Sequence, residues 1–242
     1  MYPIGHDTVH DQYKVVCIVS AHKELEHWVF ILREGVSSQG RKISSPCPPH
    51  YPEEQRLTIN GRMYYLALVS LKYHVLVSFD FSSEETRLLP KPEDVFWHGF
   101  YINLIEYAGK ISFFGHSDLV KDGVMKLWVM EDEEKNIWSR KKLVLHPSQM
   151  DMVKVNNADN NYCLNVYGTT RNGDVILAPQ KEIYPRPVEV LPSRYNTLLR
   201  FTYNIQKNHL RKIEIKDGSN CFLKYQRCEV IGLDDTRDFM HL

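Results

Sequence analysis

Residues 60–67 read NGRMYYLA and residues 75–81 read VLVSFDF, and these two segments decide the fold. The Asn-Gly dipeptide favours a tight hairpin turn, and the aromatic and β-branched residues that follow it favour strands. The second segment runs into the polar residues SSEE at positions 82–85. Together these features predict an antiparallel pair of strands that ends in a second turn.

The same order of features returns further along the chain. Residues 108–114 read AGKISFF, residues 126–130 read KLWVM, and the acidic residues EDEE follow at 131–134. The glycines that open the two repeats, Gly61 and Gly109, lie 48 positions apart. A period of about 40–50 residues with several strands in each repeat is typical of propeller blades. We therefore expect an all-β fold, a β-propeller-like array of antiparallel sheets, whether or not the array is complete.

Further strand-like segments extend this pattern, and we expect residues 1–242 to form one domain. The two clear repeats cover residues 57–90 and 100–147, and the proline-rich residues 45–52 are predicted to be a connecting loop because proline cannot donate to a β-ladder. Asn172-Gly173 predicts another hairpin turn. Short strands are also predicted at residues 13–19, 28–32, 162–167, 175–178, 198–205, 210–215 and 228–235.

Composition limits the classes of partner. The chain has 242 residues, 43% of them hydrophobic, and its 30 basic residues balance its 30 acidic residues. A nucleic-acid-binding protein usually has a basic excess, so we expect no nucleic-acid partner. The five cysteines have no paired spacing, which favours a reducing compartment. With no secretory leader and no apolar run long enough to cross a bilayer, we expect a cytoplasmic or nuclear protein with no membrane partner.

Four ordered motifs resemble the plant F-box-associated domain of type 3, and the resemblance covers essentially the whole chain. Residues 5–7 (GHD) with 11–16 (DQYKVV) are similar to the strand with which the family domain opens, and residues 59–67 (INGRMYYLA) are similar to a second family signature. Residues 77–84 (VSFDFSSE) and 127–139 (LWVMEDEEKNIWS) resemble two more.

This resemblance implies a protein-interaction module that recognises substrates for a cullin-based ubiquitin ligase. Family members normally begin with a helical F-box that docks onto the ligase adaptor subunit, and no such motif precedes Tyr2 here. We therefore expect recognition of a protein substrate without a contact to the adaptor. The alternative is a truncated family member, either a competitor or a nearly functionless fragment, with no ligase role.

Three polar motifs contain the residue types of chemical sites. His6 and His10 have the spacing of a metal pair only on a helix, whereas this segment leads into a strand. Residues 115–118 (GHSD) are neighbours in sequence and cannot converge as a catalytic triad, so they are interpreted as a connecting loop. The acidic residues 131–134 are interpreted as a solvated turn. A propeller enzyme would need convergent carboxylates or metal ligands, and we expect no enzymatic activity, no cofactor and no metal site.

The aromatic residues divide into a predicted core and a predicted binding surface. Core positions are expected at Tyr64, Phe79, Phe113, Trp128 and Trp138. Residues at loop tips or on the exposed face are candidates for protein binding, because interface hot spots favour Tyr, Trp and Arg. These candidates are Tyr51, Tyr73, His74, Trp97, His98, His116, Tyr184 and Arg186.

Overall fold

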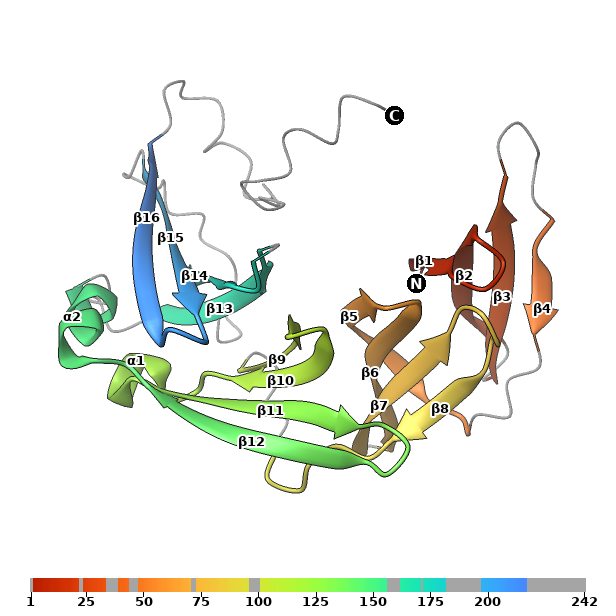
Figure 1. The fold of residues 1–242 in the computed structure, drawn as a ribbon, viewed down its shortest axis with the longest axis horizontal. Helices are drawn as coiled ribbons and strands as arrows, with labels where there is room; N and C mark the ends of the chain where they lie inside the picture. The colour runs from red at the N-terminus through yellow and green to blue at the C-terminus, as the bar shows by residue number, and fades with distance from the viewer. Residues whose placement is uncertain are drawn as a thin grey trace. The chain divides into compact units, whose positions relative to one another are not determined.

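The fold is described from a computed structural model. It covers residues 2–21, 24–33, 39–43, 48–70, 73–95, 101–155, 162–170, 172–181 and 197–216. In these ranges β-strands dominate: sixteen strands form four four-stranded sheets, and two short helices accompany them (Figure 1). The all-β, propeller-like fold class is thereby confirmed.

The chain divides into two compact units, and each is described by itself. Unit 1 comprises Met1–Gly99, Glu106–Phe113 and Trp128–Arg140. Unit 2 comprises Phe100–Ile105, Phe114–Leu127 and Lys141–Leu242. A single domain over the whole chain stays a prediction.

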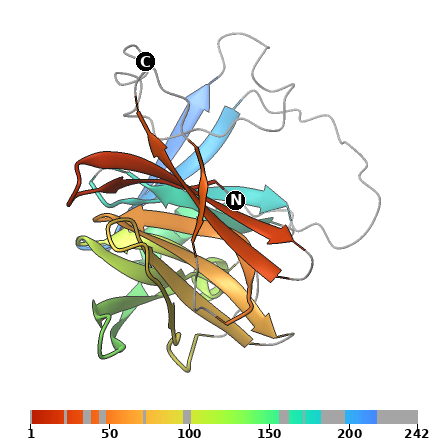
Figure 2. The same ribbon diagram turned by 90° about the vertical axis from the view of Figure 1, so that its right-hand side faces the viewer.

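The first sheet of unit 1 has the strand order β1-β2-β3-β4. Its strands are β1 (Ile4–Asp7), β2 (Gln12–Ala21), β3 (Glu24–Leu32) and β4 (Arg41–Ile43). Strands β2 and β3 pair antiparallel over nearly their full lengths and run side by side in both views (Figures 1 and 2). The predicted strands at 13–19 and 28–32 are therefore confirmed, although both extend further than expected.

The second sheet of unit 1 has the order β5-β6-β7-β8 and contains the segments that decided the fold prediction. Its strands are β5 (Tyr51–Ile59), β6 (Arg62–Ser70), β7 (Tyr73–Asp80) and β8 (Thr86–Leu89). Asn60 and Gly61 both have positive φ, 50° and 74°, as the tight hairpin turn between β5 and β6 requires.

The proline-rich loop prediction was wrong at its C-terminal end. Strand β5 begins at Tyr51, and Pro52 pairs with Ala67 of β6. A proline fits here because β5 is an edge strand, where the missing N–H removes no ladder hydrogen bond. The pairing shifts register between Pro52 and Arg56, which breaks the regular edge.

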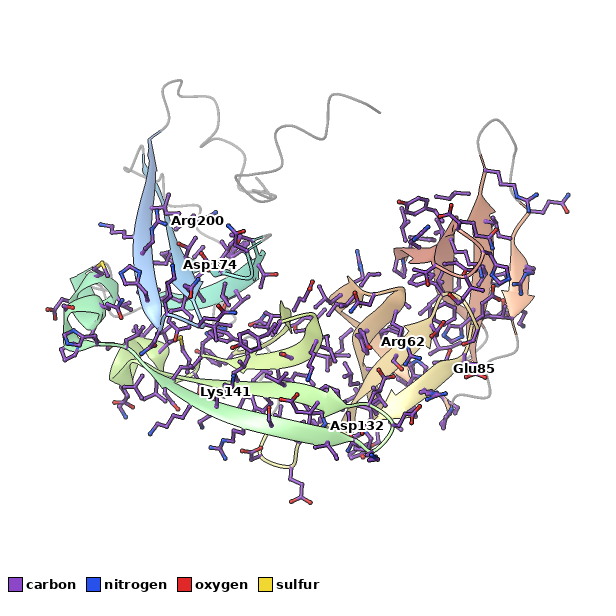
Figure 3. All side chains as sticks on the ribbon, in the orientation of Figure 1. Arg62, Glu85, Asp132, Lys141, Asp174 and Arg200 are labelled. Atoms are coloured by element: carbon purple, nitrogen blue, oxygen red, sulfur yellow. The ribbon has the colours of Figure 1, made fainter. Side chains whose placement is uncertain are left out.

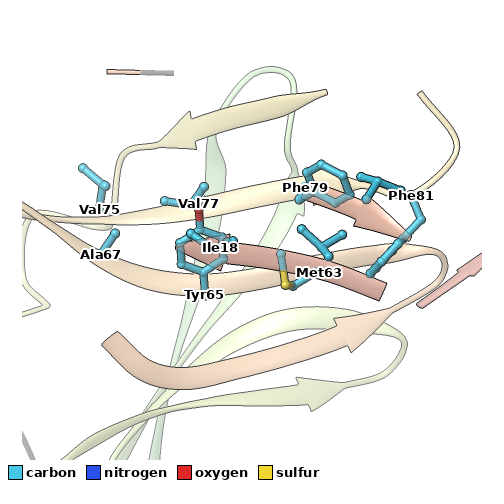
Figure 4. Close-up of a cluster of buried hydrophobic side chains, with 10 residues drawn as sticks. Ile18, Met63, Tyr65, Ala67, Val75, Val77, Phe79 and Phe81 are labelled. Atoms are coloured by element: carbon cyan, nitrogen blue, oxygen red, sulfur yellow. The ribbon is translucent and has the colours of Figure 1, made fainter. Parts of the chain in front are cut away.

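A cluster of ten buried side chains joins the two sheets of unit 1 (Figure 4). Side chains alternate along each strand, and the members of the cluster lie on the sides of the two sheets that face each other. Burial of each large apolar side chain contributes about 1.5–3 kcal/mol. The members are Val16, Ile18 and Val29 from the first sheet, and Met63, Tyr65, Ala67, Val75, Val77, Phe79 and Phe81 from β6, β7 and the following turn.

The third sheet has the order β12-β11-β10-β9, and its residues are shared between the two units. Ala108 and Gly109 again have positive φ at its first turn, 52° and 74°, which matches the turn at Asn60-Gly61. Its strands are β9 (Ile102–Tyr107), β10 (Lys110–Gly115), β11 (Val124–Asp132) and β12 (Ile137–Val144).

Helices adjoin this sheet where only strands and loops were expected. Helix α1 (Leu119–Asp122) precedes β11, and helix α2 (Pro147–Val155) follows β12. The second predicted repeat was expected to end at Pro147, but proline is favoured at the first position of a helix, and here it starts one.

The fourth sheet lies in unit 2 and has the order β13-β14-β15-β16. Gly173 (φ 78°) lies in the predicted turn before β14, which confirms that hairpin. The predicted strand at 228–235 falls outside the described residues. The strands are β13 (Tyr162–Thr169), β14 (Val175–Lys181), β15 (Thr197–Asn204) and β16 (His209–Lys216).

The predicted aromatic core is largely confirmed. Tyr64, Phe79, Phe113 and Trp128 are buried. Trp138 is only half-buried, and its ring stacks on Phe113 with 5.2 Å between the centroids.

Candidate functional site

Three of the eight predicted binding residues, Tyr51, Tyr73 and His74, lie at one end of the second sheet. Tyr51 and Tyr73 are the first residues of β5 and β7, and both are more than half exposed, at 62% and 53%. In the strand register, Tyr51 faces Leu68 of β6, and Leu68 faces His74 of β7. Tyr73 faces Ser70 instead and, as the neighbour of His74 in β7, it points to the other face of the sheet. We call this end of the sheet, with Tyr51, Glu53, Leu68, Tyr73 and His74, the Tyr51 surface.

An ion-pair contact connects the two outer strands of this surface. The Nε2 atom of His74 lies 3.1 Å from Oε1 of Glu53, and both side chains are mostly buried. Because β6 lies between β5 and β7, the contact crosses over the central strand. It links the bulged part of β5 to β7 within the same sheet.

A buried histidine lies directly beneath the Tyr51 surface. His50 precedes Tyr51, and its Nε2 atom lies 2.7 Å from the hydroxyl oxygen of Tyr65, while its Nδ1 atom lies 2.9 Å from the carbonyl oxygen of Pro48. His27 of β3 is its neighbour, with 6.1 Å between the ring centroids. Burial lowers the pKa of both imidazoles, that of His27 to about 4, and the proximity of His50 adds to the shift at His27.

Sequence analysis missed both of these histidines. A signal was present for His27, because Leu25, His27 and Val29 alternate along β3 and their neighbours on this face are apolar. Such a pattern indicates that the histidine faces the core. No comparable signal identifies His50, whose burial depends on the hydroxyl of Tyr65.

The expectation that His116 lies exposed at a loop tip was wrong. It is only 2% exposed, and its Nε2 atom lies 3.0 Å from Oδ1 of Asn103. Its backbone N–H donates to the carbonyl of Tyr101, which holds the residue against the buried end of β10. Burial lowers the pKa of His116 to about 4.

The other four predicted binding residues are Trp97, His98, Tyr184 and Arg186. They lie outside the described residues, so their binding role stays a prediction.

The prediction of a solvated acidic turn at residues 131–134 was wrong at Glu133. Its side chain is 15% exposed and accepts hydrogen bonds from Arg62 (2.8 Å), Tyr64 (2.8 Å) and Ser78 (2.9 Å). Burial and the Glu133 carboxylate raise the pKa of Tyr64. Figure 3 shows Arg62 on β6 and Asp132, the residue before Glu133, at the end of β11. This carboxylate fastens the β11–β12 turn to the second sheet.

A second buried ion cluster joins the first two sheets. The Nζ atom of Lys14 lies 2.7 Å from Asp7 and 2.8 Å from Glu84, and it donates to the carbonyl of Phe81. Burial alone would raise the pKa of Asp7, but hydrogen bonds from Lys14 and from the backbone of His10 hold it far below its usual range.

His10 lies in a turn that leads into β2, as expected, whereas His6 already belongs to a strand. His6 lies in β1, its imidazole contacts Asp11, and that of His10 contacts Asp7. Of residues 115–118, interpreted as a connecting loop, Gly115 is the last residue of β10 and residues 116–118 connect it to α1, so the interpretation is confirmed for these three.

The described polar clusters therefore serve mainly to hold sheets together. Across the ranges given above, no three His, Cys, Asp or Glu side chains gather as metal ligands. Among those same residues, no helix combines the length and apolar character needed to span a bilayer. The Tyr51 surface differs from these clusters because its aromatic rings face solvent.

Known proteins resemble this chain over its whole length. The model of the F-box associated beta propeller domain matches residues 1–236. The F-box/kelch-repeat protein At4g19930 of Arabidopsis thaliana is 50% identical over 254 residues, which cover 100% of this chain and 56% of the relative. The F-box protein At4g19940 of the same plant is 48% identical over 251 residues, with 100% and 56% coverage. The chain thus spans little more than half the length of these relatives.

Proposed function

The chain belongs to the family of F-box-associated β-propeller domains, and on that premise we propose that it is a protein-recognition module. The Tyr51 surface is its proposed contact site. The observation that carries this proposal is the pair of solvent-facing tyrosines, Tyr51 and Tyr73, at one end of an otherwise well-packed sheet.

Tyrosine suits such a surface for physical reasons. Its ring supplies a large contact area with few rotatable bonds, and its hydroxyl remains compatible with water. The half-buried Leu68 lies between the two outer strands and adds apolar area. The Glu53–His74 pair borders this area, which resembles the apolar centre and polar rim of protein interfaces.

The proposed role is recognition and not catalysis. The carboxylates of Asp7, Glu84 and Glu133 are each held by cationic or hydroxyl donors from neighbouring strands. Groups held in this way stabilise the sheets. In a longer protein that also contains an F-box, we propose that the module selects a substrate for ubiquitination.

The binding surface is tested by capture from plant extract with two matched double variants. Tyr51→Ala with Tyr73→Ala removes the proposed surface, while Tyr13→Ala with Tyr167→Ala removes two tyrosines of similar exposure, 57% and 54%, elsewhere. Captured proteins are quantified by mass spectrometry. We expect a defined set to fall at least tenfold with the first variant and to be unchanged with the second. Equal capture by both would refute the surface.

The ligase role needs a separate experiment. The chain and a fusion of it to an F-box are compared for co-purification with the adaptor subunit and for the cellular half-life of the captured proteins. We expect the fusion to bind the adaptor and to shorten those half-lives. If the fusion binds the adaptor while the half-lives stay unchanged, the alternative of a competitor without a ligase role is favoured.

A further inference from the structure

His50 and Tyr51 are neighbours whose side chains have opposite environments. His50 is buried at the contact between the first two sheets of unit 1, whereas Tyr51 faces solvent. In an extended segment successive side chains point to opposite faces, so the position of one determines the position of the other. Anything that moves His50 therefore moves the first residue of the Tyr51 surface.

The hydrogen bonds of His50 define its protonation state. The Pro48 carbonyl 2.9 Å from Nδ1 only accepts, so Nδ1 carries the hydrogen and donates it. In the neutral ring Nε2 is then an acceptor, and the Tyr65 hydroxyl at 2.7 Å donates to it. This is the arrangement of a neutral His50; in a protonated ring Nε2 carries a hydrogen, so the Tyr65 hydroxyl would have to reorient and accept from it.

His27 lies beside His50 in a site where a positive charge would be unfavourable. Both of its ring nitrogens are buried without a hydrogen-bond partner in the described part of the chain. It pairs with Ile18 of β2 and Ile43 of β4, which are apolar. From the side of the second sheet, the titratable ring beside it is that of His50, 6.1 Å away between centroids, and Tyr65 lies next to His50, 5.7 Å away.

The two charged side chains of β4 are Lys42, which binds Glu26, and Arg41, which is directed to Glu84. Glu84 in turn binds Lys14, which also holds Asp7. Glu53 of β5 pairs with His74. These four carboxylates, Asp7, Glu26, Glu53 and Glu84, thus already have partners, and a proton on His27 or His50 would meet no free counter-charge among them.

We propose that His50 is a positioning residue for the Tyr51 surface and that His27 and His50 together form an acid-sensitive latch, whose protonation releases the start of β5. This inference rests on the proposed function for its biological meaning. The structural change itself can be measured on this chain without a binding partner.

Protonation favours the released form for two reasons. It replaces the acceptor at Nε2 of His50 with a second N–H group, so the Tyr65 hydroxyl can only accept at this contact and can no longer donate to it. It also places two positive rings about 6 Å apart in a buried site. In the released form both rings reach water and take up protons at their ordinary pKa. The ratio of released to closed molecules then rises up to about tenfold per pH unit for each histidine.

The latch is tested by amide hydrogen exchange on the full chain between pH 7 and pH 5, corrected for the intrinsic exchange rate. We expect protection of residues 51–56 in β5 and of their partners in β6 to fall at least tenfold. Residues 76–89 of β7 and β8, in the same sheet, are the internal control and should change less than threefold. A uniform change would indicate unfolding of the whole unit and would overturn the proposal.

Two substitutions separate the latch from general acid sensitivity. His50→Gln keeps an acceptor for the Tyr65 hydroxyl but does not titrate, and His27→Leu replaces the unpartnered ring with an apolar side chain of similar size. Each should reduce the pH response, and the double variant should abolish it while neutral-pH protection is retained. A double variant with the pH response of the wild type would refute the latch.

These outcomes are independent of the binding experiment. A missing pH response overturns the latch and leaves the proposed surface intact. A normal pH response with unchanged capture by the Tyr51 and Tyr73 variant overturns the surface and leaves the latch intact.

Discussion

Replacement of Glu133 by alanine should destabilise unit 1, although the residue lies in an acidic turn. The substitution removes the acceptor of three side chains, Tyr64, Ser78 and Arg62. Tyr64 and Ser78 are buried, so their hydroxyls are left without this partner and away from water. Arg62 keeps Asp80, whose Oδ2 lies 3.0 Å from Nη2, and it is 33% exposed.

The magnitude follows from these environments. A buried donor that loses its partner costs about 1–3 kcal/mol, and a partly exposed ion pair contributes about 0–1 kcal/mol. Two such donors with some relaxation give a loss of about 3 kcal/mol in the free energy of unfolding. For a chain of this length that corresponds to a fall in Tm of about 6–12 °C.

The assay is urea and thermal unfolding followed by circular dichroism, with Glu134→Ala as the matched control. Glu134 is the exposed neighbour, so its removal should change stability by less than about 0.5 kcal/mol. A double-mutant cycle with Tyr64→Phe should show coupling, because the two changes remove the same hydrogen bond. Equal stability of the two alanine variants would refute the structural role of Glu133.

Two further predictions concern packing and pH. Gly5→Ala should lower the free energy of unfolding by about 1–3 kcal/mol, because the added Cβ would lie 2.0 Å from the buried ring of Phe81. A second substitution, Phe81→Leu, should partly restore the loss. Urea unfolding measures both effects, and a change below about 0.5 kcal/mol for Gly5→Ala would contradict the prediction. Burial lowers the pKa of His116 to about 4 in the folded chain, so His116 of the unfolded chain binds a proton at a higher pH than His116 of the folded chain. The free energy of unfolding therefore falls as the pH drops from about 6.5 towards 4. Between pH 7 and pH 5, the free energy of unfolding of His116→Gln should fall by about 2 kcal/mol less than that of the wild type. Equal decreases would show that His116 does not contribute to the pH dependence of stability.

The strands and turns were predictable because their signals are local. Asn60-Gly61 and Ala108-Gly109 have the positive φ angles that their turns require, and the flanking residues alternate as strands do. Helix α2 was missed because nine residues with weak periodicity after Pro147 carry little local signal. Pro52 was assigned to a loop because only the sheet order shows that β5 is an edge strand.

The candidate site was predicted in part. The register of β5, β6 and β7 places Tyr51 and His74 on either side of Leu68, and Tyr73 lies at the same end of the sheet as the neighbour of His74. His116 was assigned to the surface because histidine in a polar loop is usually exposed, whereas here it is packed between Tyr101 and Phe114.

The sequence by itself determined the all-β class, the hairpins and the aromatic core, since these depend on residues a few positions apart. Only the tertiary structure decided which polar side chains are buried. Glu133 meets Arg62, Tyr64 and Ser78 from 55 to 71 positions away, and His50 meets Tyr65 and His27 across two sheets. The free energy of a polar group depends on the partners and water around it, and those partners are assembled only when distant strands pack.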